Sequence, residues 1–554
     1  MRSLKEIAFR LRQEASNLAL LARPPWLPGT FLAPDVPLLP AISAPTKDEI
    51  ARLAETIRSH QIPLFDLKLD FGSPILWRRD PLSGRETPPQ YFRRIHYLSV
   101  EEAGDHKFIW ELNRHQHLVV LAQAGDDASL RALFSELESW ISQNPFQCGI
   151  NWASALEVAF RALSWIQIYQ KAGGRMTPEF RQQFLQNLYR HGRHLEANLS
   201  IYFSPNTHLL GEAVALHALG ALFSDFPGAA RWAETGRRWV ANEYVRQVRA
   251  DGSHFEQSSY YHVYALDMFL FHARLAGASA QERTVLGRMA DFLEALLGPN
   301  GELPFLGDDD GGRLFHPYGP RALFARDTLR AANAFLGRAP SQPRSRLFED
   351  AGIAVMESGD RHILMDAGPF GPGSAGHSHS DTLSIVVRSG QEWLLIDPGT
   401  YTYVGDPTER ARFRGTGAHN TVRVAGRDQA LAAGPFRWND PPRVRVLEWS
   451  TSDTRDILMA ECAYGGFVHR RRVVFEKPGH LVVTDDMDGP PGEHLVEQFW
   501  HAGSINAVRH LTVEGGVQRE GWRSTGYGSK HPGPMIMVEK RTALPCRLVA
   551  ALEF

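Results

Sequence analysis

The sequence predicts a multidomain α+β protein with a helical first part and an antiparallel, β-rich second part. At 554 residues the chain is too long for one ordinary hydrophobic core, and its length alone suggests about three domains. Apolar residues recur at helical spacing from about residue 100 to 340. Beyond about residue 350 the period of the apolar pattern changes from 3.6 to 2, which is typical of strands.

Composition excludes several classes of protein. A net charge of −2 and a pI near 6.9 give no reason to expect a nucleic-acid partner. The three cysteines, Cys148, Cys462 and Cys546, are too far apart for a disulfide framework or a CxxC metal site. No apolar run reaches 18 residues, so we expect no transmembrane helix.

The N-terminal stretch predicts a helix, because Leu4, Ile7, Ala8 and Leu11 recur at helical spacing among charged residues. It lacks the uninterrupted apolar segment and small-residue cleavage site of a secretory signal, so the sequence predicts a protein that is not exported by that route. A Pro-rich connector over 24–45 and a short strand over 62–71 follow.

The middle of the chain predicts pairs of antiparallel helices arranged in a ring. Leu156, Ala159, Phe160 and Leu163 form one apolar helix face, and the later helical stretches have similar lengths and Gly-, Pro- or Asn-containing connections. These stretches are 177–198, 208–223, 230–249, 261–276 and 280–297. Gly and Pro over 337–343 mark the end of this part.

The last part predicts an antiparallel β-sandwich or stacked sheets. Short apolar runs alternate with turn residues there, as in RHILMDAG, RVRVLEW, RRRVVFE and HLVVTDDM. Of the arginines 470–472 in the third run, we expect a solvent-exposed face or a local contact with an acidic ligand.

The stretch 374–419 carries the clearest chemistry. If it is extended, His377 and His379 share a face, and the strand-like run 383–387 follows them. A second apolar run, 393–396, delivers Asp397. Two imidazoles and a carboxylate, from His379, Asp397 and His419, suit zinc or a similar divalent ion. The alternative is that the two nearby histidines are polar residues of a surface turn.

Two clusters in the helical part also draw attention. Lys107, Glu111 and Arg114 lie at i, i+4 and i+7, which could be a substrate-binding face or a surface ion-pair ladder. His208 and Glu212 share a helix face in SPNTHLLGE, after an Asn206 that could be an ordinary N-cap.

Two further stretches are dense in functional groups. DGSHFEQSSYYHVY, 251–264, brings Tyr260 and Tyr261 together with several polar side chains and suits a sugar platform, although core packing could account for one tyrosine. Asp308, Asp309 and Asp310 could form a metal loop, supply a hydrolase acid or lie in a solvated turn, and their spacing fits no EF-hand.

Taken in order, these motifs resemble the heparinase II/III family of polysaccharide lyases. The resemblance covers roughly residues 60–425 and implies an incomplete (α/α) toroid followed by an antiparallel β-sandwich domain. We therefore expect an N-terminal segment 1–95, a toroid 96–345 and a sandwich 346–554. The matching motifs are GDHKFIWELNRHQH, NWASALEVAFRALSW, SPNTHLLGEA, DGSHFEQSSYYHVY, GHSHSDTLSI, LLIDPGTYTY and FRGTGAHNTV.

The resemblance also implies roles for single residues. Asn206, with His208, would neutralise a uronate carboxylate. Tyr261 would be the catalytic acid or acid/base and His377 the partner base, and the two could exchange roles if the uronate stereochemistry differs. His379, Asp397 and His419 would bind a metal, zinc or alternatively calcium. One sequence does not decide which of the two adjacent tyrosines faces the substrate. As contacts to substrate we expect Lys107, Glu111, Arg114, Glu212, Tyr260 and Arg414.

These expectations predict a lyase that cleaves a uronate-containing polysaccharide by β-elimination, acting as a monomer or homodimer on an anionic chain. Many members of the family are periplasmic or secreted, so the resemblance implies a periplasmic location. The lack of a recognisable secretory signal points the other way. One alternative is a uronyl C5-epimerase, which shares the proton abstraction. A hydrolase would need two carboxylates flanking the bond and would leave the histidines unexplained. A non-catalytic glycan-binding or assembly factor is the alternative from another class.

Overall fold

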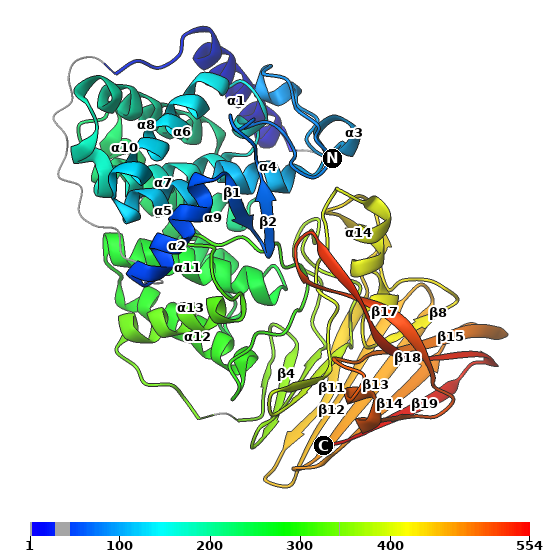
Figure 1. Cartoon of the computed structure of the whole chain (residues 1–554). Coiled ribbons are helices and arrows are strands. Elements are labelled where there is room, and N and C mark those ends of the chain that lie inside the picture. Colours follow the sequence, from blue (N-terminus) through cyan, green and yellow to red (C-terminus); the bar gives the residue numbers. More distant parts are fainter. Residues whose placement is uncertain (1–2, 28–44, 343) are drawn as a thin grey trace. The chain divides into compact units, whose positions relative to one another are not determined.

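The computed structural model describes residues 3–27, 45–342 and 344–554, so most of the predicted Pro-rich connector (28–44) lies outside the described residues (Figure 1). The chain divides into two compact units. Unit 1 comprises Met1–Val245, Asp267–Ser279 and Gly312–Tyr318. Unit 2 comprises Arg246–Leu266, Ala280–Gly311 and Gly319–Phe554. None of the described helices is both long and apolar enough to cross a membrane.

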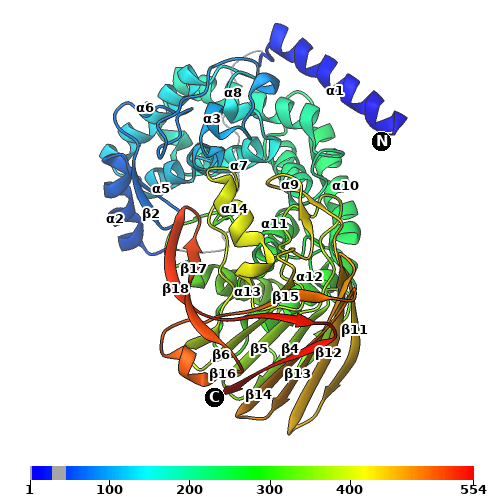
Figure 2. The ribbon, with the colours of Figure 1, turned by 90° about the vertical axis from the view of Figure 1, so that its right-hand side faces the viewer.

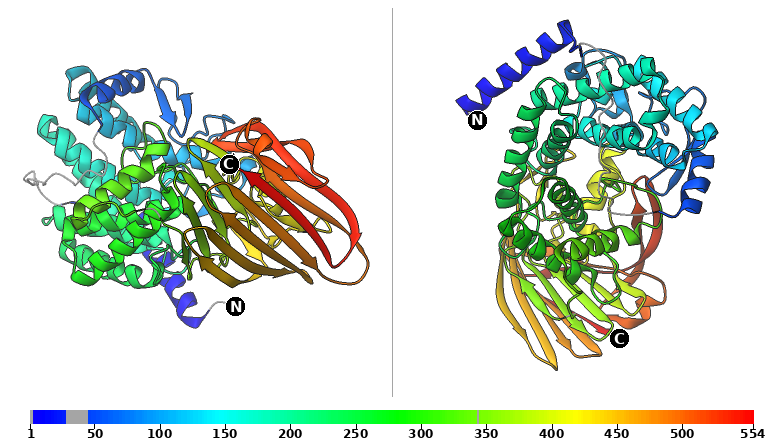
Figure 3. Two further views of the ribbon diagram at one scale, coloured as in Figure 1. Left: turned by 90° about the horizontal axis from the view of Figure 1, so that it is seen from below. Right: turned by 90° about the vertical axis from the view of Figure 1, so that its left-hand side faces the viewer.

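The predicted helices are confirmed, and they build the expected incomplete (α/α) toroid (Figure 3). Sequence sets their ends: Thr177 caps α8 by accepting from the backbone N–H of Phe180, with Pro178 in the first turn. α7 contacts α5, α8 and α9 and is buried on nearly every side. The helices are α1 Leu4–Ala22, α2 Lys47–Arg58, α3 Val100–Ala103, α4 His106–Asn113, α5 Gln116–Ala124, α6 Asp127–Gln143, α7 Ala155–Ala172, α8 Pro178–Asn198, α9 Thr207–Leu222, α10 Ala229–Gln247, α11 Ser259–Ala276, α12 Ala280–Leu297, α13 Ala322–Leu336 and α14 Pro407–Arg414.

The single strand predicted over 62–71 is wrong. The chain forms a hairpin of β1 (Gln61–Leu64) and β2 (Leu67–Asp70), paired in antiparallel register. The hairpin turns at Phe65, whose φ is 57°, a left-handed conformation that ends a strand. The continuous alternation of apolar residues across the turn conceals this break.

Unit 2 contains three antiparallel sheets that share a hydrophobic core, as the period of 2 predicts. Strands β11 to β14 run side by side in the largest sheet (Figure 2). The five-stranded sheet is β3 Arg346–Phe348, β4 Ile353–Ser358, β5 Arg361–Asp366, β6 Ile385–Ser389 and β7 Glu392–Leu395. The six-stranded sheet is β11 Arg443–Thr451, β12 Arg455–Tyr464, β13 Phe467–Glu476, β14 His480–Asp488, β19 Cys546–Glu553 and β16 Leu511–Val513. The four-stranded sheet is β17 Val517–Gly526, β18 Ser529–Ala543, β15 Glu493–His501 and β8 Val422–Val424, and β9 Leu431–Ala432 pairs with β10 Trp438–Asn439.

The segment that carries the two nearby histidines is not a strand, which corrects the prediction of an extended stretch. Residues 371–384 form turns and bends, and β6 begins only at Ile385. Leu383 has a φ of 64°, which breaks the alternation that a strand would need. Hydrogen bonds from other elements therefore fix His377 and His379, and the pleat of a sheet does not.

The arginine run on β13 alternates between the core and the surface. Arg471 is fully buried and donates two hydrogen bonds, of 2.7 and 2.8 Å, to the carboxylate of Asp485. His469 Nε2 lies 2.7 Å from the same carboxylate. Arg471 also donates to the backbone carbonyls of Leu383 and Asn420. Arg471 thus corrects the expectation of a solvent-exposed face at this position, because it is buried in an internal ion pair. Its contacts join the sandwich core to the segments that carry the histidines.

We expect R471A to destabilise unit 2 by about 3–5 kcal/mol, because it leaves the buried Asp485 carboxylate without its cation. R472A is the matched control, since Arg472 lies on the same strand, is 42% exposed and is 3.9 Å from Glu448. Its loss should stay below about 0.5–1 kcal/mol. Urea denaturation measures both. Equal destabilisation by the two variants would contradict the buried role of Arg471.

Several buried histidines predict that unit 1 loses stability in acid. Burial lowers the pKa of His106, His194 and His272 to about 3 and that of His316 to about 4. The unfolded chain binds protons at these sites below about pH 6.5, whereas the folded chain does not. Burial raises the pKa of Glu212 to about 8 and opposes the trend by one proton. These four histidines and Glu212 alone should lower the stability by roughly 4 kcal/mol for each unit by which the pH falls near pH 5.

Calorimetric unfolding in buffers of different ionisation enthalpy measures the proton uptake. We expect net uptake at pH 5, reduced by about one proton in H194F. Phenylalanine suits that position because the His194 ring already packs edge-on or tilted against Phe92, Phe146 and Trp152. Net proton release on unfolding at pH 5 would show that the histidines are not held neutral.

Candidate active site

Five segments of unit 2 supply the side chains of the candidate site. They are the start of α11 with Tyr261, the segment after α12 with Asp308, the turn with His377 and His379, the residues after β7, and α14 with the short turn behind it. The side chains of Asp308, His377, His379 and Arg410 are all at least nine-tenths buried.

Asp308 lies at the centre of this cluster. Its carboxylate accepts hydrogen bonds from Arg410 Nη1 at 2.5 Å and Arg410 Nη2 at 2.8 Å. His377 Nδ1 lies 3.2 Å from one carboxylate oxygen, and His379 Nε2 lies 2.9 Å from the other. Burial alone would raise the pKa of Asp308, but Arg410 and the two histidines lower it well below the ordinary value.

Tyr261 stacks on His377. The ring centroids are 3.8 Å apart and the rings are inclined by 22°. The Tyr261 hydroxyl lies 3.1 Å from the hydroxyl of Tyr403. Burial raises the pKa of Tyr261 well above 10, and the charges of Asp310 and Asp308 raise it further, so the phenol keeps its proton at neutral pH.

The other ring nitrogen of His377 points toward a second carboxylate, with Nε2 3.5 Å from Glu256 Oε2. Burial would lower the pKa of His377, but the hydrogen bond with Asp308 and the charge of Glu256 outweigh it, and the pKa is raised. The arrangement therefore holds a basic imidazole face to face with a protonated phenol. These are the groups that a proton abstraction and a proton donation require.

The predicted metal ligands come together. His379, Asp397 and His419 are buried, and each offers a ligand atom within 4.8 Å of the others. His419 Nδ1 lies 2.7 Å from Asp397 Oδ2. Within the described part of the chain, His379 Nδ1 and His419 Nε2 are buried without a hydrogen-bond partner. Buried polar atoms without partners are costly, so this donor set could hold a metal ion.

Two carboxylates next to this triad support a cation there. Burial raises the pKa of Asp366 to about 8, and burial also raises that of Asp381, on which the charge of Asp397 acts in the same direction. A bound cation would favour the charged forms of these groups.

The predicted ladder of unit 1 is a buried network, not a surface one. Lys107 Nζ lies 2.9 Å from Glu111, and Arg114 contacts Glu111 at 2.9 Å and Glu157 at 2.6 Å. Burial would raise the pKa of Glu157, but Arg114 and Lys107 lower it, and the charge of His208 acts in the same direction, so His208 lies near the same network. The helical spacing predicts that these side chains share a face, but it does not predict that the face is buried.

Asn206 begins α9, and its side chain accepts from the backbone N–H of His208 at 3.1 Å, so it is an N-cap. Glu212 is fully buried and accepts 2.7 and 2.6 Å hydrogen bonds from the backbone and hydroxyl of Ser200. The capping hydrogen bond of Asn206 uses only its side-chain oxygen, so the side-chain nitrogen takes no part in it.

Tyr260 and Arg414 lie in unit 2. The guanidinium of Arg321 covers the Tyr260 ring at 4.5 Å. Arg414 is buried, donates to the carbonyls of Gly434 and Pro435, and covers the Trp438 ring at 4.4 Å. Of the two adjacent tyrosines, Tyr261 is the one that contacts the histidine cluster.

Sequence reasoning did not assign Asp308, Arg410 or Tyr403 to the site. The Asp-Asp-Asp run carries the signal for Asp308, but its composition equally suits an exposed turn, whereas Asp308 is fully buried. Arg410 lies 102 residues from its partner Asp308 in the sequence, and no local sequence pattern predicts that the two side chains pair.

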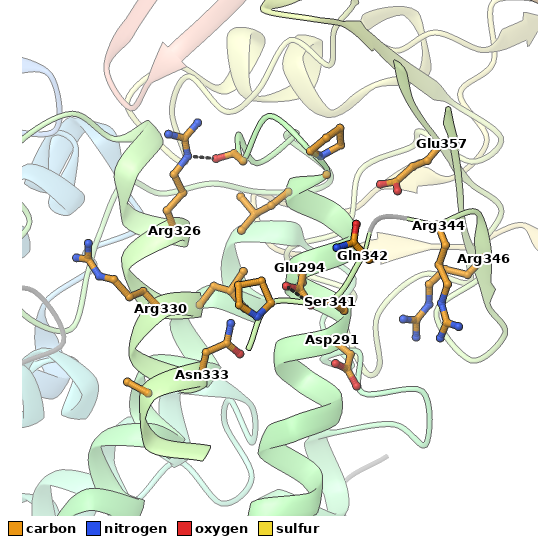
Figure 4. Close-up of a pocket in the computed structure, with 18 residues that line it drawn as sticks. Asp291, Glu294, Arg326, Arg330, Asn333, Ser341, Gln342, Arg344, Arg346 and Glu357 are labelled. Carbon is orange, nitrogen blue, oxygen red and sulfur yellow. Dashed lines mark hydrogen bonds between the residues drawn. The ribbon is translucent and has the colours of Figure 1, made fainter. Parts of the chain in front are cut away.

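A cavity of about 570 Å³ elsewhere in unit 2 is not this site (Figure 4). It is lined by α12, α13 and the segment before β3, and its side chains have mixed charge, including Asp291, Glu294, Arg330 and Arg346. Arg326 there donates to the carbonyl of Gly301. None of the candidate catalytic or metal-binding residues lines it.

Comparison with known proteins places the chain in a class, that of proteins with a heparinase III-like fold. It matches a solved structure described as heparinase III with a TM-score of 0.73 and 17% identity, over 98% of this chain and 89% of the other. A heparan sulfate lyase from Pedobacter heparinus matches with a TM-score of 0.59 and 19% identity, over 99% and 88%.

Two models of protein families match this chain and identify its family. The model described as heparinase II/III N-terminus matches residues 49–309, and the model described as heparinase II/III-like, C-terminal, matches residues 340–538. The chain belongs to the heparinase II/III family.

Among curated relatives, a heparin-sulfate lyase of Bacteroides stercoris is 24% identical over 497 residues, 77% of this chain and 72% of the relative. A heparin-sulfate lyase of Pedobacter heparinus is also 24% identical, over 69% of this chain and 60% of the relative.

We expect the purified full chain to retain about one divalent ion per molecule, and H379A and H419A to lose it, because each removes one of three ligands. H480A is the control, since His480 is 40% exposed and pairs with Glu553 on the sandwich surface. Elemental analysis after dialysis measures the content. At a metal concentration 100 times the Kd, binding should stabilise the wild type by about 2.7 kcal/mol. Equal metal content in H379A and wild type would exclude this site.

Proposed function

We propose that this protein is a polysaccharide lyase that cleaves a uronate-containing chain by β-elimination. The observation that carries the proposal is the stacking of Tyr261 on His377 at 3.8 Å, which holds a proton donor beside a base. Family membership supports the reaction class, since the curated relatives are named heparin-sulfate lyases.

In the proposed reaction, His377 removes the C5 proton of the uronate through Nε2, because Nδ1 is engaged by Asp308. The electrons of the broken C5–H bond form the C4–C5 double bond, and the C4–O bond to the leaving sugar breaks. Tyr261 protonates the leaving oxygen, and the resulting phenolate regains a proton from solvent or from His377. Tyr403, 3.1 Å from the Tyr261 hydroxyl, would orient that hydroxyl.

Removal of the C5 proton leaves an enolate-like charge on the uronate carboxylate, which a hydrogen-bond donor must stabilise. Asn206 is the proposed donor, with His208 beside it, on the strength of the motif SPNTHLLGE. Lys107, Glu111, Arg114, Glu212, Tyr260 and Arg414 remain proposed substrate-binding residues.

We further propose that His379, Asp397 and His419 hold zinc, because imidazole nitrogens suit zinc better than calcium, which prefers oxygen ligands. When bound, the metal would supply a fixed positive charge and hold the segments that carry its ligands. The elimination itself needs only the chain's own acid and base.

The test is the ultraviolet absorbance of a 4,5-unsaturated uronide. Wild-type protein is incubated with heparan-type chains, hyaluronan, alginate and bacterial exopolysaccharides. We expect product from at least one of them, and rates lower by about 100-fold or more in Y261F and H377A, the usual size of an acid–base contribution. Y464F is the matched control, because Tyr464 is a buried tyrosine of the sandwich core whose hydroxyl donates to the backbone carbonyl of Val422.

Three results would replace the proposal. New reducing ends without the absorbance would indicate hydrolysis. Solvent deuterium at C5 without cleavage would indicate an epimerase. Affinity for a glycan without either reaction, across the whole panel, would indicate a glycan-binding protein.

A further inference from the structure

The Asp308 carboxylate contacts the candidate base and a candidate metal ligand at the same time. Its two oxygens lie 3.2 Å from His377 Nδ1 and 2.9 Å from His379 Nε2. The two histidines therefore face one carboxylate through different ring nitrogens. This asymmetry has a chemical consequence, because a neutral imidazole carries its proton on only one nitrogen.

Arg410 keeps Asp308 an acceptor. The guanidinium binds both oxygens in a two-pronged contact, at 2.5 and 2.8 Å, and it cannot lose its own proton. An ionised carboxylate has no hydrogen to donate, so each histidine nitrogen that faces it must be the donor. Thr400 adds a donor hydroxyl at 3.3 Å, which nearly fills the acceptor positions of the carboxylate.

The backbone holds the carboxylate in this place. The N–H of Asp308 donates to the carbonyl of His377 at 2.8 Å, and the Ser258 hydroxyl donates to the carbonyl of Asp308 at 2.6 Å. Gly307 has a φ of +66°, and a Cβ there would lie 2.6 Å from the same His377 carbonyl. Any side chain at Gly307 would therefore push the two segments apart.

We propose that Asp308 is a positioning residue that fixes the tautomers of both histidines in opposite senses. His377 Nδ1 lies 3.2 Å from Asp308, closer than the 3.5 Å between its Nε2 and Glu256, so the neutral ring carries its fixed proton on Nδ1. Nε2 is then the nitrogen that gains and loses the transferred proton. His379 carries its proton on Nε2, so Nδ1 is left as a lone pair. That same His379 Nδ1 is buried without a hydrogen-bond partner in the described part of the chain, as an atom that awaits a metal would be.

One buried carboxylate thus prepares a base and a metal ligand together. The catalytic consequence for His377 rests on the proposed lyase function, whereas the tautomers themselves do not. They can be measured in the full chain without substrate.

The experiment is nitrogen-15 magic-angle-spinning NMR of the full chain labelled at histidine, at alkaline pH where the imidazoles are neutral. Signals are assigned by their loss in H377Q and H379Q. We expect a protonated Nδ1 for His377 and a protonated Nε2 for His379. Zinc added to the metal-free chain should shift the Nδ1 signal of His379 and leave both nitrogen signals of His377 in place. The reverse tautomer at either histidine of the wild type would overturn the proposal.

D308N tests the cause. Its amide has one accepting oxygen and one donating nitrogen, so one of the two histidines must accept, and its tautomer should invert. D309N is the matched control, because Asp309 is the next residue, is equally well buried and pairs with Arg321. It should leave both tautomers unchanged. Unchanged tautomers in a folded D308N protein would also overturn the proposal.

Kinetics separates positioning from a merely structural role. We expect D308N to lower kcat by about 100-fold or more with KM within about threefold, because a wrong tautomer affects the chemical step and leaves binding intact. If D308N instead lowers kcat and raises KM by the same factor while both tautomers stay as in the wild type, Asp308 has a structural role only. If no substrate is found, the NMR result still decides the tautomers, so the two proposals fail separately.

Discussion

The buried ion pair between Arg410 and Asp308 is the constraint on which the site depends. Removing two ions from water costs several kcal/mol each, and only close, well-directed contacts offset that cost. Here Asp308 accepts hydrogen bonds from both terminal nitrogens of the Arg410 guanidinium, and Arg410 donates further to the carbonyls of Pro435 and Gly376. The pair therefore joins four segments of the chain, those of Asp308, Gly376, Arg410 and Pro435.

A second buried network supports the same segments from the sandwich side. Asn420 follows a metal-ligand candidate directly, and its amide nitrogen donates to the carbonyls of Ile385 and Ile396 at 2.7 and 2.8 Å. Its oxygen accepts from the backbone of His501 at 2.6 Å, and its carbonyl accepts from Arg471. The ends of β6, β7 and β15 thus fix the backbone that presents His419. A loop anchored to a packed core in this way holds its ligands without regular secondary structure.

Much of the fold could be predicted from periodicity, because the period depends on which face is buried and the sequence records that directly. The helices from Pro178 to Leu297 and the strands of the sandwich fall close to the predicted ranges. The failures share a cause: alternation in 62–71 and 383–387 continues through residues whose backbone turns, Phe65 and Leu383. Hydrophobic pattern does not encode a positive φ at a residue other than glycine.

The site was predictable only in part, for a related reason. Residue types near one another in sequence, such as His377 and His379, suggest a site by themselves. Burial and pairing over a hundred residues do not, so Asp308 was indistinguishable from its neighbours, and Arg410 was one arginine among several. The same limit made the buried network of Lys107 and Glu111 look like a surface ladder.

The charges around the stacked pair favour one assignment of acid and base. A tyrosine base would require a phenolate at Tyr261, beside Asp308 and Asp310, whose negative charges raise its pKa. A histidine base requires only that His377 lose a proton from Nε2, and the carboxylates that raise its pKa make the neutral form a stronger base. In the proposed elimination, Tyr261 would keep its proton until negative charge develops on the leaving oxygen. The buried carboxylates would make exchange of the two proposed roles costly, and protons would then move from the substrate carbon to the imidazole and from the phenol to the leaving group.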